Sequence, residues 1–278
     1  MKGVLVLGSN GSLGKSICKE LKKNKFLFYS QSRSKKNKYY CNFKNTKSFS
    51  KLLQKTKPKI VINTISNINV KNCEKNFLKC FKDNILTAFI VSKICGEKKI
   101  KQFYISTDQV YSEKKFSLEK NTNPVNNYSY SKIIAEKFVL ENHGIVLRVN
   151  FIHRDKKKRT FNDQVILKKS KKITLYKNIF FNPLHISTLS KIIVISLKKI
   201  KKGIYNIGSK DKISKEKFIL ELCGMLNLKR NFKCINYKPV GIKRPLDMSM
   251  NVNKITRLLK IKKYDVLTEI KKLSKEYK

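Results

Sequence analysis

Short apolar runs alternate along the chain with longer segments in which apolar residues recur every three or four positions. Six runs are typical of buried strands: residues 2–7, 26–29, 60–63, 102–106, 144–149 and 203–208. Helical periodicity begins at Tyr128 and also occupies residues 12–21, 46–55, 73–93, 189–197 and 214–223. Strands that alternate with helices predict an α/β fold built on a Rossmann-like, doubly wound parallel sheet.

A glycine-rich turn directly follows the first predicted strand. Gly8, Gly11 and Gly14 are spaced three apart, and a helical pattern begins within the turn. A strand, a glycine turn and a helix place a pyrophosphate on the helix N-terminus, because glycines let the backbone approach the phosphates closely. We therefore predict a dinucleotide site rather than a simple turn. Its phosphate-binding residues are expected to be Gly8, Asn10, Gly11, Ser12, Leu13 and Gly14.

The end of the second predicted strand indicates which dinucleotide binds. A carboxylate there would accept a hydrogen bond from the adenosine ribose 2′-hydroxyl and favour NAD. The sequence instead has Ser32 and Arg33, followed by Ser34-Lys35-Lys36. Hydroxyls and cations suit a 2′-phosphate, so NADPH is the expected cofactor and NADH stays an alternative. Asn42 and Phe43 are expected near the adenine.

Polar residues also end the third and fourth predicted strands. Asn63-Thr64-Ile65 ends the third strand, and Ser106-Thr107-Asp108 ends the fourth. Ligands of doubly wound sheets bind at the carboxyl ends of the strands. These two strand ends and the glycine turn therefore predict one continuous site, with Asn63, Thr64 and Ile65 facing the cofactor.

Tyr128 and Lys132 lie four residues apart, so they share one face of the helix that begins there. With 12 tyrosines in so lysine-rich a chain, a few such pairs are expected by chance, and the sequence has three. Only this pair is followed by a helical pattern and preceded by a strand that ends in Ser106-Thr107. A neighbouring ammonium lowers the pKa of a phenol, which makes Tyr128 a candidate proton donor or acceptor. Thr107 or Ser106 would then hold the substrate oxygen.

The formal net charge of +46 raises the question of nucleic-acid binding. Only seven of the 64 basic residues are arginine, the residue that base and phosphate recognition favours, and the lysines are spread along the chain. We therefore expect no specific nucleic-acid partner.

The seven cysteines and three histidines show no metal-site spacing, and scattered cysteines suit a reducing compartment. No apolar run approaches the ~20 residues that span a bilayer, so we expect a soluble cytoplasmic protein without membrane insertion.

Two loops in the second half of the chain contain basic side chains. Residues 153–160 form either a solvated surface loop or a segment that closes over an anionic substrate. Arg244, which precedes Pro245, is either a clamp for a diphosphate or an anchor for its own loop.

Taken in order, these motifs resemble the extended short-chain dehydrogenases/reductases, and among them the dTDP-4-dehydrorhamnose reductase branch. The resemblance covers nearly the whole chain. It rests on Gly8-x2-Gly11-x2-Gly14, Asn63, Cys73-Glu74-x-Asn76, Asn84, Ser106-Thr107-Asp108-x-Val110-Tyr111, Tyr128-x3-Lys132-x3-Glu136, Pro183, Tyr205-Asn206-Ile207-Gly208 and Arg244-Pro245. We expect a dinucleotide-binding domain over residues 1–150 and a smaller, mainly substrate-binding lobe over 151–278, from which about 184–207 returns to the first domain.

The same resemblance implies hydride transfer from NADPH to a 4-keto group of a nucleotide-diphospho-sugar, in the synthesis of surface polysaccharide sugars. Tyr128 would be the catalytic acid, Lys132 would bind the nicotinamide ribose and tune Tyr128, and Thr107 would orient the carbonyl. The substrate contacts would come from Ser106, Asp108, Phe151 and Arg244. A homodimer is left open.

The chain departs from this branch in three places. Thr64-Ile65-Ser66 stands where small residues usually follow the asparagine of the third strand, Lys71 where an acidic residue is usual, and Phe151 where a tryptophan is usual. All three bear on which sugar is bound. The alternatives are epimerisation or dehydration at the same site, and a noncatalytic, NADP-binding regulatory subunit. Dehydration is disfavoured because it usually needs a second carboxylate, and the residue after Asp108 is Gln109.

Overall fold

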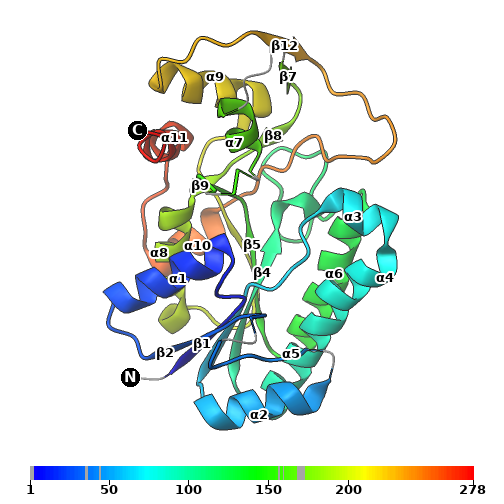
Figure 1. Cartoon of the computed structure of the whole chain (residues 1–278), viewed down its shortest axis with the longest axis vertical. Coiled ribbons are helices and arrows are strands. Elements are labelled where there is room, and N and C mark those ends of the chain that lie inside the picture. The colour runs from blue at the N-terminus through cyan, green and yellow to red at the C-terminus, as the bar shows by residue number, and fades with distance from the viewer. Residues whose placement is uncertain (1–2, 35–36, 44, 156, 159, 168–172) are drawn as a thin grey trace.

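A six-stranded parallel sheet forms the centre of the molecule (Figure 1). The computed structural model describes residues 3–34, 37–43, 45–155, 157–158, 160–167 and 173–278, so residue 2 of the first predicted strand and Lys35-Lys36 lie outside it. Across the sheet, the strands are β10 (Gly203–Ile207), β5 (Ile145–Val149), β4 (Lys101–Thr107), β3 (Ile60–Asn63), β1 (Val4–Leu7) and β2 (Phe28–Gln31). Most of their residues are buried, as expected for a parallel sheet covered on both faces. The predicted doubly wound α/β fold is confirmed.

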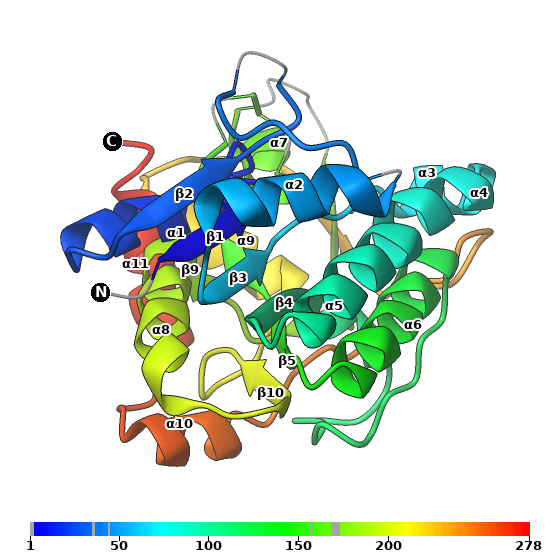
Figure 2. The same ribbon diagram turned by 90° about the horizontal axis from the view of Figure 1, so that it is seen from below.

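Helices cover the two faces of this sheet (Figure 2). One face carries α1 (Ser12–Lys23), α8 (Ile186–Lys199) and α10 (Asn253–Leu259), which share an apolar core with the strands. The other face carries α2 (Thr46–Thr56), α5 (Thr87–Glu97) and α6 (Asn127–Glu141). Because β10 pairs with β5 and α8 packs against α1, segments from late in the chain complete the sheet and its cover.

The second strand begins two residues later than predicted. Lys25 has φ +54, and the Phe26 amide donates to the Leu21 carbonyl at 3.0 Å, so both residues belong to the turn that ends α1. Pairing with β1 begins at Phe28, opposite Val4. The apolar pattern could not show this difference, because Phe26 packs on the core as a strand residue would.

The single helix predicted over residues 73–93 is wrong. The segment consists of α3 (Val70–Lys75), α4 (Phe77–Cys80), a π-helix η1 (Phe81–Leu86) and then α5. The break lies at Asn76, which has φ −140 and accepts a hydrogen bond from the Lys79 amide at 2.9 Å. Asparagine side chains compete with the helical backbone in this way and favour caps over helix interiors.

The C-terminal part of the chain forms a second apolar core beyond the carboxyl ends of the sheet strands (Figure 1). Its helices are α7 (Phe161–Ile166), α9 (Lys215–Met225) and α11 (Val266–Ser274). Its short strands pair in twos: β7 (Ile173–Tyr176) with β12 (Phe232–Ile235), β8 (Phe180–Phe181) with β11 (Ile213–Ser214), and β6 (Phe151–Ile152) with β9 (Leu184–His185). Ser214 caps α9 by accepting from the Lys217 amide at 3.0 Å, as its position predicts.

None of the helices in the described part of the chain is long and apolar enough to cross a membrane. The same residues contain no group of three or more His, Cys, Asp or Glu side chains placed to hold a metal ion. All seven cysteines are free thiols.

Candidate active site

The glycine turn lies at the carboxyl end of β1, and its glycines are needed for steric reasons. Gly8 has φ +79, and a Cβ there would lie 2.7 Å from Thr64 Oγ1. A Cβ on Gly14 would lie 2.4 Å from the Gly8 carbonyl oxygen and 2.8 Å from Ser9 Cα. Gly11 is the N-cap of α1, and no described side chain caps this helix end. The first turn of α1 therefore presents its backbone N–H groups for an anion.

The turn is held in place by a residue that the sequence did not identify. Gln31 accepts two hydrogen bonds from the turn. Its side-chain Oε1 accepts from the Gly8 amide at 3.2 Å, and its backbone carbonyl accepts from the Ser9 amide at 2.9 Å. Asn10 is exposed at the tip of the turn, Ser12 begins α1, and Leu13 is buried in the core beneath it. The sequence signal that could have identified Gln31 is its position as a polar residue at the end of an apolar strand.

Gly14→Ala should weaken both dinucleotide binding and stability. The added methyl group would meet backbone atoms of Gly8 and Ser9, which cannot give way without moving the turn. Such overpacking costs about 1–3 kcal/mol, although alanine is otherwise favoured over glycine in a helix. The melting temperature and the NADPH dissociation constant measure the two effects.

Gly224→Ala is the matched control for this substitution. Gly224 lies in α9, and a Cβ there meets nothing within 4 Å. We expect this variant to be as stable as the wild type or more stable by up to about 1 kcal/mol. Equal melting temperatures for the two variants would contradict the steric role of Gly14.

The loop after β2 contains the residues predicted to select the dinucleotide. Ser32 is buried, and Arg33 is exposed. Further on, the Asn42 amide donates to Ser48 Oγ at 3.1 Å, and Phe43 packs on Phe49 with 5.6 Å between ring centroids. The structure thus keeps Arg33 accessible to an anion and gives Phe43 a fixed partner.

Asn63, at the end of β3, has a buried amide group with an unused donor. Its Oδ1 accepts from the Ile65 amide at 3.0 Å, while no described residue accepts from its Nδ2. Thr64 donates to the Leu7 carbonyl at 2.7 Å and so ties the ends of β3 and β1 together. Because buried donors are nearly always hydrogen-bonded, the free Nδ2 of Asn63 suits a ligand at this strand end.

The three predicted catalytic residues come together at the carboxyl end of β4. Tyr128 lies in the first turn of α6, which a capping box between Asn126 and Ser129 begins. Its side chain is 4% exposed and lies near the side chain of Thr107, the last residue of β4. Lys132 follows one turn later and is 1% exposed. The cluster is therefore buried and built from two rigid elements.

The electrostatics of this cluster differ from the prediction that Lys132 lowers the pKa of Tyr128. Burial raises the pKa of Tyr128, and the nearby Thr107 hydroxyl only partly opposes this increase. Lys132 instead donates to the Ile105 carbonyl at 2.8 Å, and its Nζ lies 4.2 Å from the centroid of the Tyr104 ring. Burial lowers the pKa of Lys132 to about 7. Tyr128 is thus protonated at neutral pH, as a proton donor must be.

Asp108 extends the cluster on the side of Thr107. It begins a short 3₁₀ helix, η2 (Asp108–Val110), and its carboxylate accepts from Thr107 Oγ1 at 3.2 Å and from Asn150 Nδ2. Burial raises the pKa of Asp108 to about 6, although Asn150 and the charge of Lys215 lower it. Neither Asn150 nor Lys215 was predicted to belong to the site. Asn150 directly follows β5, and this strand-end position is a signal that could have identified it. Nothing near Lys215 in the sequence indicates that it lies close to the site.

Ser106 is not brought to this cluster. Neighbouring strand residues face opposite sides of a sheet, and Ser106 Oγ donates to Glu136 Oε1. Arg148 Nη2 also donates to Glu136, at 2.6 Å, and Arg148 Nη1 donates to Tyr111 Oη at 2.7 Å. The structure therefore places the Ser106 hydroxyl in a buried ionic network and not beside Tyr128.

The two other predicted substrate residues lie on loops and short strands. Phe151 is half-buried in β6, with its ring centroid 5.5 Å from that of His153. Arg244 is also half-buried, and the carbonyl of the preceding Lys243 accepts from Asn126 Nδ2 at 3.1 Å. The Arg244 loop is thus held against the end of α6 that carries Tyr128. No described residue accepts a hydrogen bond from the Arg244 guanidinium, and its role as clamp or anchor stays a prediction.

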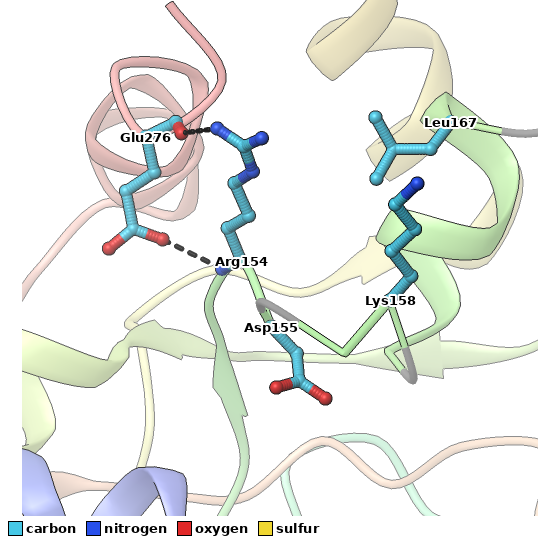
Figure 3. Close-up of a pocket in the computed structure, with 5 residues that line it drawn as sticks. All are labelled: Arg154, Asp155, Lys158, Leu167 and Glu276. Carbon is cyan, nitrogen blue, oxygen red and sulfur yellow. Dashed lines mark hydrogen bonds between the residues drawn. The ribbon is translucent and has the colours of Figure 1, made fainter.

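A separate hollow of about 460 Å³ lies in the C-terminal part (Figure 3). Its lining residues are Arg154, Asp155, Lys158, Leu167 and Glu276. Arg154 donates to Glu276 twice, through its backbone amide at 2.7 Å and through Nη1 to the carbonyl oxygen at 2.6 Å. Three of the lining residues, Arg154, Asp155 and Lys158, belong to the 153–160 loop, whereas Leu167 and Glu276 lie outside every predicted site. Lys156 and Arg159 lie outside the described residues, so closure of the 153–160 loop over a substrate stays a prediction.

The chain matches a family model and several known proteins. The family model described as the RmlD substrate binding domain matches residues 1–278. The dTDP-D-glucose 4,6-dehydratase of Dictyostelium discoideum is 30% identical over 207 residues, which cover 63% of this chain but only 47% of the dehydratase. The methionine adenosyltransferase 2 subunit beta of Xenopus laevis is 23% identical, with 91% of this chain and 81% of that protein covered.

Solved structures show the same fold. The dTDP-4-dehydrorhamnose reductase of Bacillus anthracis, crystallised in complex with NADP, superimposes with a TM-score of 0.88. The match covers 99% of both chains, and 21% of the residues are identical.

Proposed function

Since the chain belongs to the family described as the RmlD substrate binding domain, we propose that it is an NADPH-dependent reductase of a nucleotide-diphospho-4-keto sugar. This family membership confirms the resemblance that the ordered motifs indicated. The observation that carries the proposal is the burial of Thr107 at the end of β4 and of Tyr128 and Lys132 in the first turns of α6. These residues lie at the same edge of the sheet as the glycine turn, where doubly wound sheets bind their ligands.

The residues of the turn and strand ends fit a dinucleotide. Gly8 and Gly14 leave room for a close approach, α1 begins with uncapped amides, and Asn63 has an unused buried donor. The exposed Arg33 beside Ser32 supports NADPH, since a guanidinium and a hydroxyl can both bind a 2′-phosphate. The Bacillus anthracis reductase, with NADP bound, has the same fold. NADH stays the alternative.

The cluster can perform a carbonyl reduction when the nicotinamide supplies the hydride. Thr107 would hold the substrate carbonyl oxygen by hydrogen bonding, next to the Tyr128 hydroxyl. Tyr128 would then give its proton to that oxygen as the alcohol forms. Because burial raises the pKa of Tyr128, the phenol carries this proton throughout the neutral range. Lys132 would bind the nicotinamide ribose, and Arg244 would bind the diphosphate.

The direct test is reduction of dTDP-4-dehydrorhamnose, monitored through the loss of NADPH absorbance. We expect turnover with NADPH, and a lower kcat/KM with NADH. Tight binding of NADPH without reduction of this sugar or of other 4-keto nucleotide sugars would contradict the proposal.

That last outcome would favour a noncatalytic regulatory subunit. The observation behind this second candidate is the similarity to methionine adenosyltransferase 2 subunit beta over 91% of the chain. Dehydration is less well supported, although one relative is a dehydratase, because Gln109 follows Asp108 where a second carboxylate is usual. A homodimer, a cytoplasmic location, the absence of a nucleic-acid partner and the division into domains at residue 150 stay predictions.

A further inference from the structure

The aromatic ring of Tyr104 lies directly against the ammonium of Lys132. Tyr104 belongs to β4 and is completely buried, and Lys132 Nζ lies over its ring, 4.2 Å from the centroid. The ammonium also donates to the Ile105 carbonyl at 2.8 Å, which is its one hydrogen bond to the described residues. Because an ammonium has three donors, the ring and this carbonyl hold the cation and leave donors available for a ligand.

The contact involves the ring of Tyr104 and not its hydroxyl. The ring packs among apolar side chains of the helices that cover this face of the sheet, Ala88 from α5 and Ala135 and Val139 from α6. In the described part of the chain, no residue forms a hydrogen bond with the buried Tyr104 hydroxyl. An unpaired buried hydroxyl lowers stability, so packing alone would favour phenylalanine at this position. The aromatic face is therefore the part of Tyr104 that acts on Lys132.

The charged form of Lys132 depends on its surroundings. Burial lowers the pKa of Lys132 to about 7, so the ammonium can lose its proton near neutral pH. Besides Tyr104, the titratable groups that face it are Glu136, one turn further along α6, and Cys80 at the end of α4. The Glu136 carboxylate is already bound by Arg148, at 2.6 Å from Nη2, which neutralises much of its charge. The Tyr104 ring thus adds a direct contact that favours the ammonium.

We propose that Tyr104 is a positioning residue, whose ring keeps the Lys132 ammonium charged and in place to bind the nicotinamide ribose. This inference rests on the proposed function, which assigns Lys132 to that ribose. An aromatic face attracts a cation through its π-electrons, and the attraction is strongest where water is excluded, as it is around these two residues. Without the ring, the ammonium would lose its proton at a lower pH.

Tyr104→Leu should shift the pH dependence of cofactor binding. Deprotonation of Lys132 removes a charged donor, so the affinity for NADP⁺ should fall about tenfold as the pH rises through the pKa of Lys132. In Tyr104→Leu, the midpoint of this fall should lie about one pH unit lower, because the ring stabilises the ammonium and not the neutral amine. Isothermal titration from about pH 5 to about pH 9 measures the midpoint without requiring turnover. Tyr104→Met, which also lacks a ring, serves if the leucine variant does not fold.

Three further variants separate this effect from a loss of packing. Tyr104→Phe keeps the ring and should keep the wild-type midpoint, with a melting temperature at least as high because the unpaired hydroxyl is gone. Phe103→Leu removes a buried ring from the opposite face of the same strand. It should lower the melting temperature as Tyr104→Leu does, but leave the midpoint unchanged. Lys132→Met should lack the fall, and its curve supplies the baseline for titration of the cofactor's own phosphates.

An unchanged midpoint in Tyr104→Leu would overturn the inference, and so would an equal shift in Phe103→Leu, since the effect would then come from a loosened core. A fall in affinity that persists in Lys132→Met would overturn it too, because the ammonium would not be the group that titrates. Reduction by the wild type is measured separately. A midpoint that shifts only in Tyr104→Leu, in a protein that reduces no 4-keto nucleotide sugar, would support the inference for cofactor binding and contradict the proposed function.

Discussion

Tyr128→Phe should lower kcat for NADPH-dependent reduction by about 10²–10⁴-fold, the usual contribution of a positioned general acid. The substitution removes only the hydroxyl, so the carbonyl oxygen would lose its proton donor while the ring still fills the same buried space. The fold should be kept, because α6 begins with the capping box of Asn126 and Ser129 and does not depend on the phenol. NADPH affinity should change little, since the glycine turn and the end of β3 are untouched.

Tyr130→Phe is the matched control, because Tyr130 lies in the same helix and is 50% exposed. It should reduce the keto sugar at the wild-type rate. Steady-state kinetics of both variants, together with NADPH titrations, separate a chemical effect from a binding effect. Wild-type kcat in Tyr128→Phe would mean that another group supplies the proton.

The residues whose position at the strand ends could be predicted from the sequence are those with local signals. A glycine turn between a strand and a helix, or a polar residue at the end of an apolar run, can be recognised within about ten residues. Parallel strands then bring those ends to one edge of the sheet, so that Gly8, Asn63 and Thr107 need no further information to be grouped. For the same reason, the strand boundaries of β3 were predicted to the residue.

The parts that the sequence missed depend on contacts between distant segments. Lys215 approaches Asp108 only because the C-terminal part packs beyond the strand ends, and neither residue has a local pattern that indicates this. The pKa prediction for Tyr128 was wrong for a related reason. Spacing on a helix shows that Lys132 shares a face with Tyr128, but it does not show that the ammonium binds the Ile105 carbonyl instead.

The break at Asn76 shows a competition that periodicity alone does not resolve. Residues 73–93 keep an apolar helical pattern, yet the Asn76 side chain caps a new helix and the π-helix η1 follows. The π-helix brings Asn84 to Ser131 of α6, where its Nδ2 donates to the hydroxyl at 2.9 Å. Irregular helices of this kind are frequent at functional sites, and here the irregular segment supports the helix that carries Tyr128.

Arg148→Met should lower the free energy of unfolding by about 3–5 kcal/mol, the usual cost of removing one partner of a buried ion pair. Arg148 is 2% exposed and donates to both carboxylate oxygens of Glu136, with 2.6 Å from Nη2 to Oε2. It also donates to Tyr111 Oη and to the Glu119 carbonyl, each at 2.7 Å. Methionine has a similar length but no donors, so the buried Glu136 carboxylate would lose its cationic partner and keep only the hydrogen bond from Ser106.

The loss should be smaller when Glu136 is neutralised as well. In Glu136→Gln/Arg148→Met no uncompensated charge remains, so we expect this double variant to be more stable than Arg148→Met alone, although both lack the same donors. Arg257→Met, at an exposed position in α10, should stay within about 0.5 kcal/mol of the wild type. Denaturant unfolding of the wild type, Glu136→Gln, Arg148→Met and the double variant gives the coupling between the two charges, and Arg257→Met serves as the control. Equal losses in the single and double variants would show that Arg148 acts through its packing and its bonds to Tyr111 and Glu119, and that the charge of Glu136 is tolerated without it.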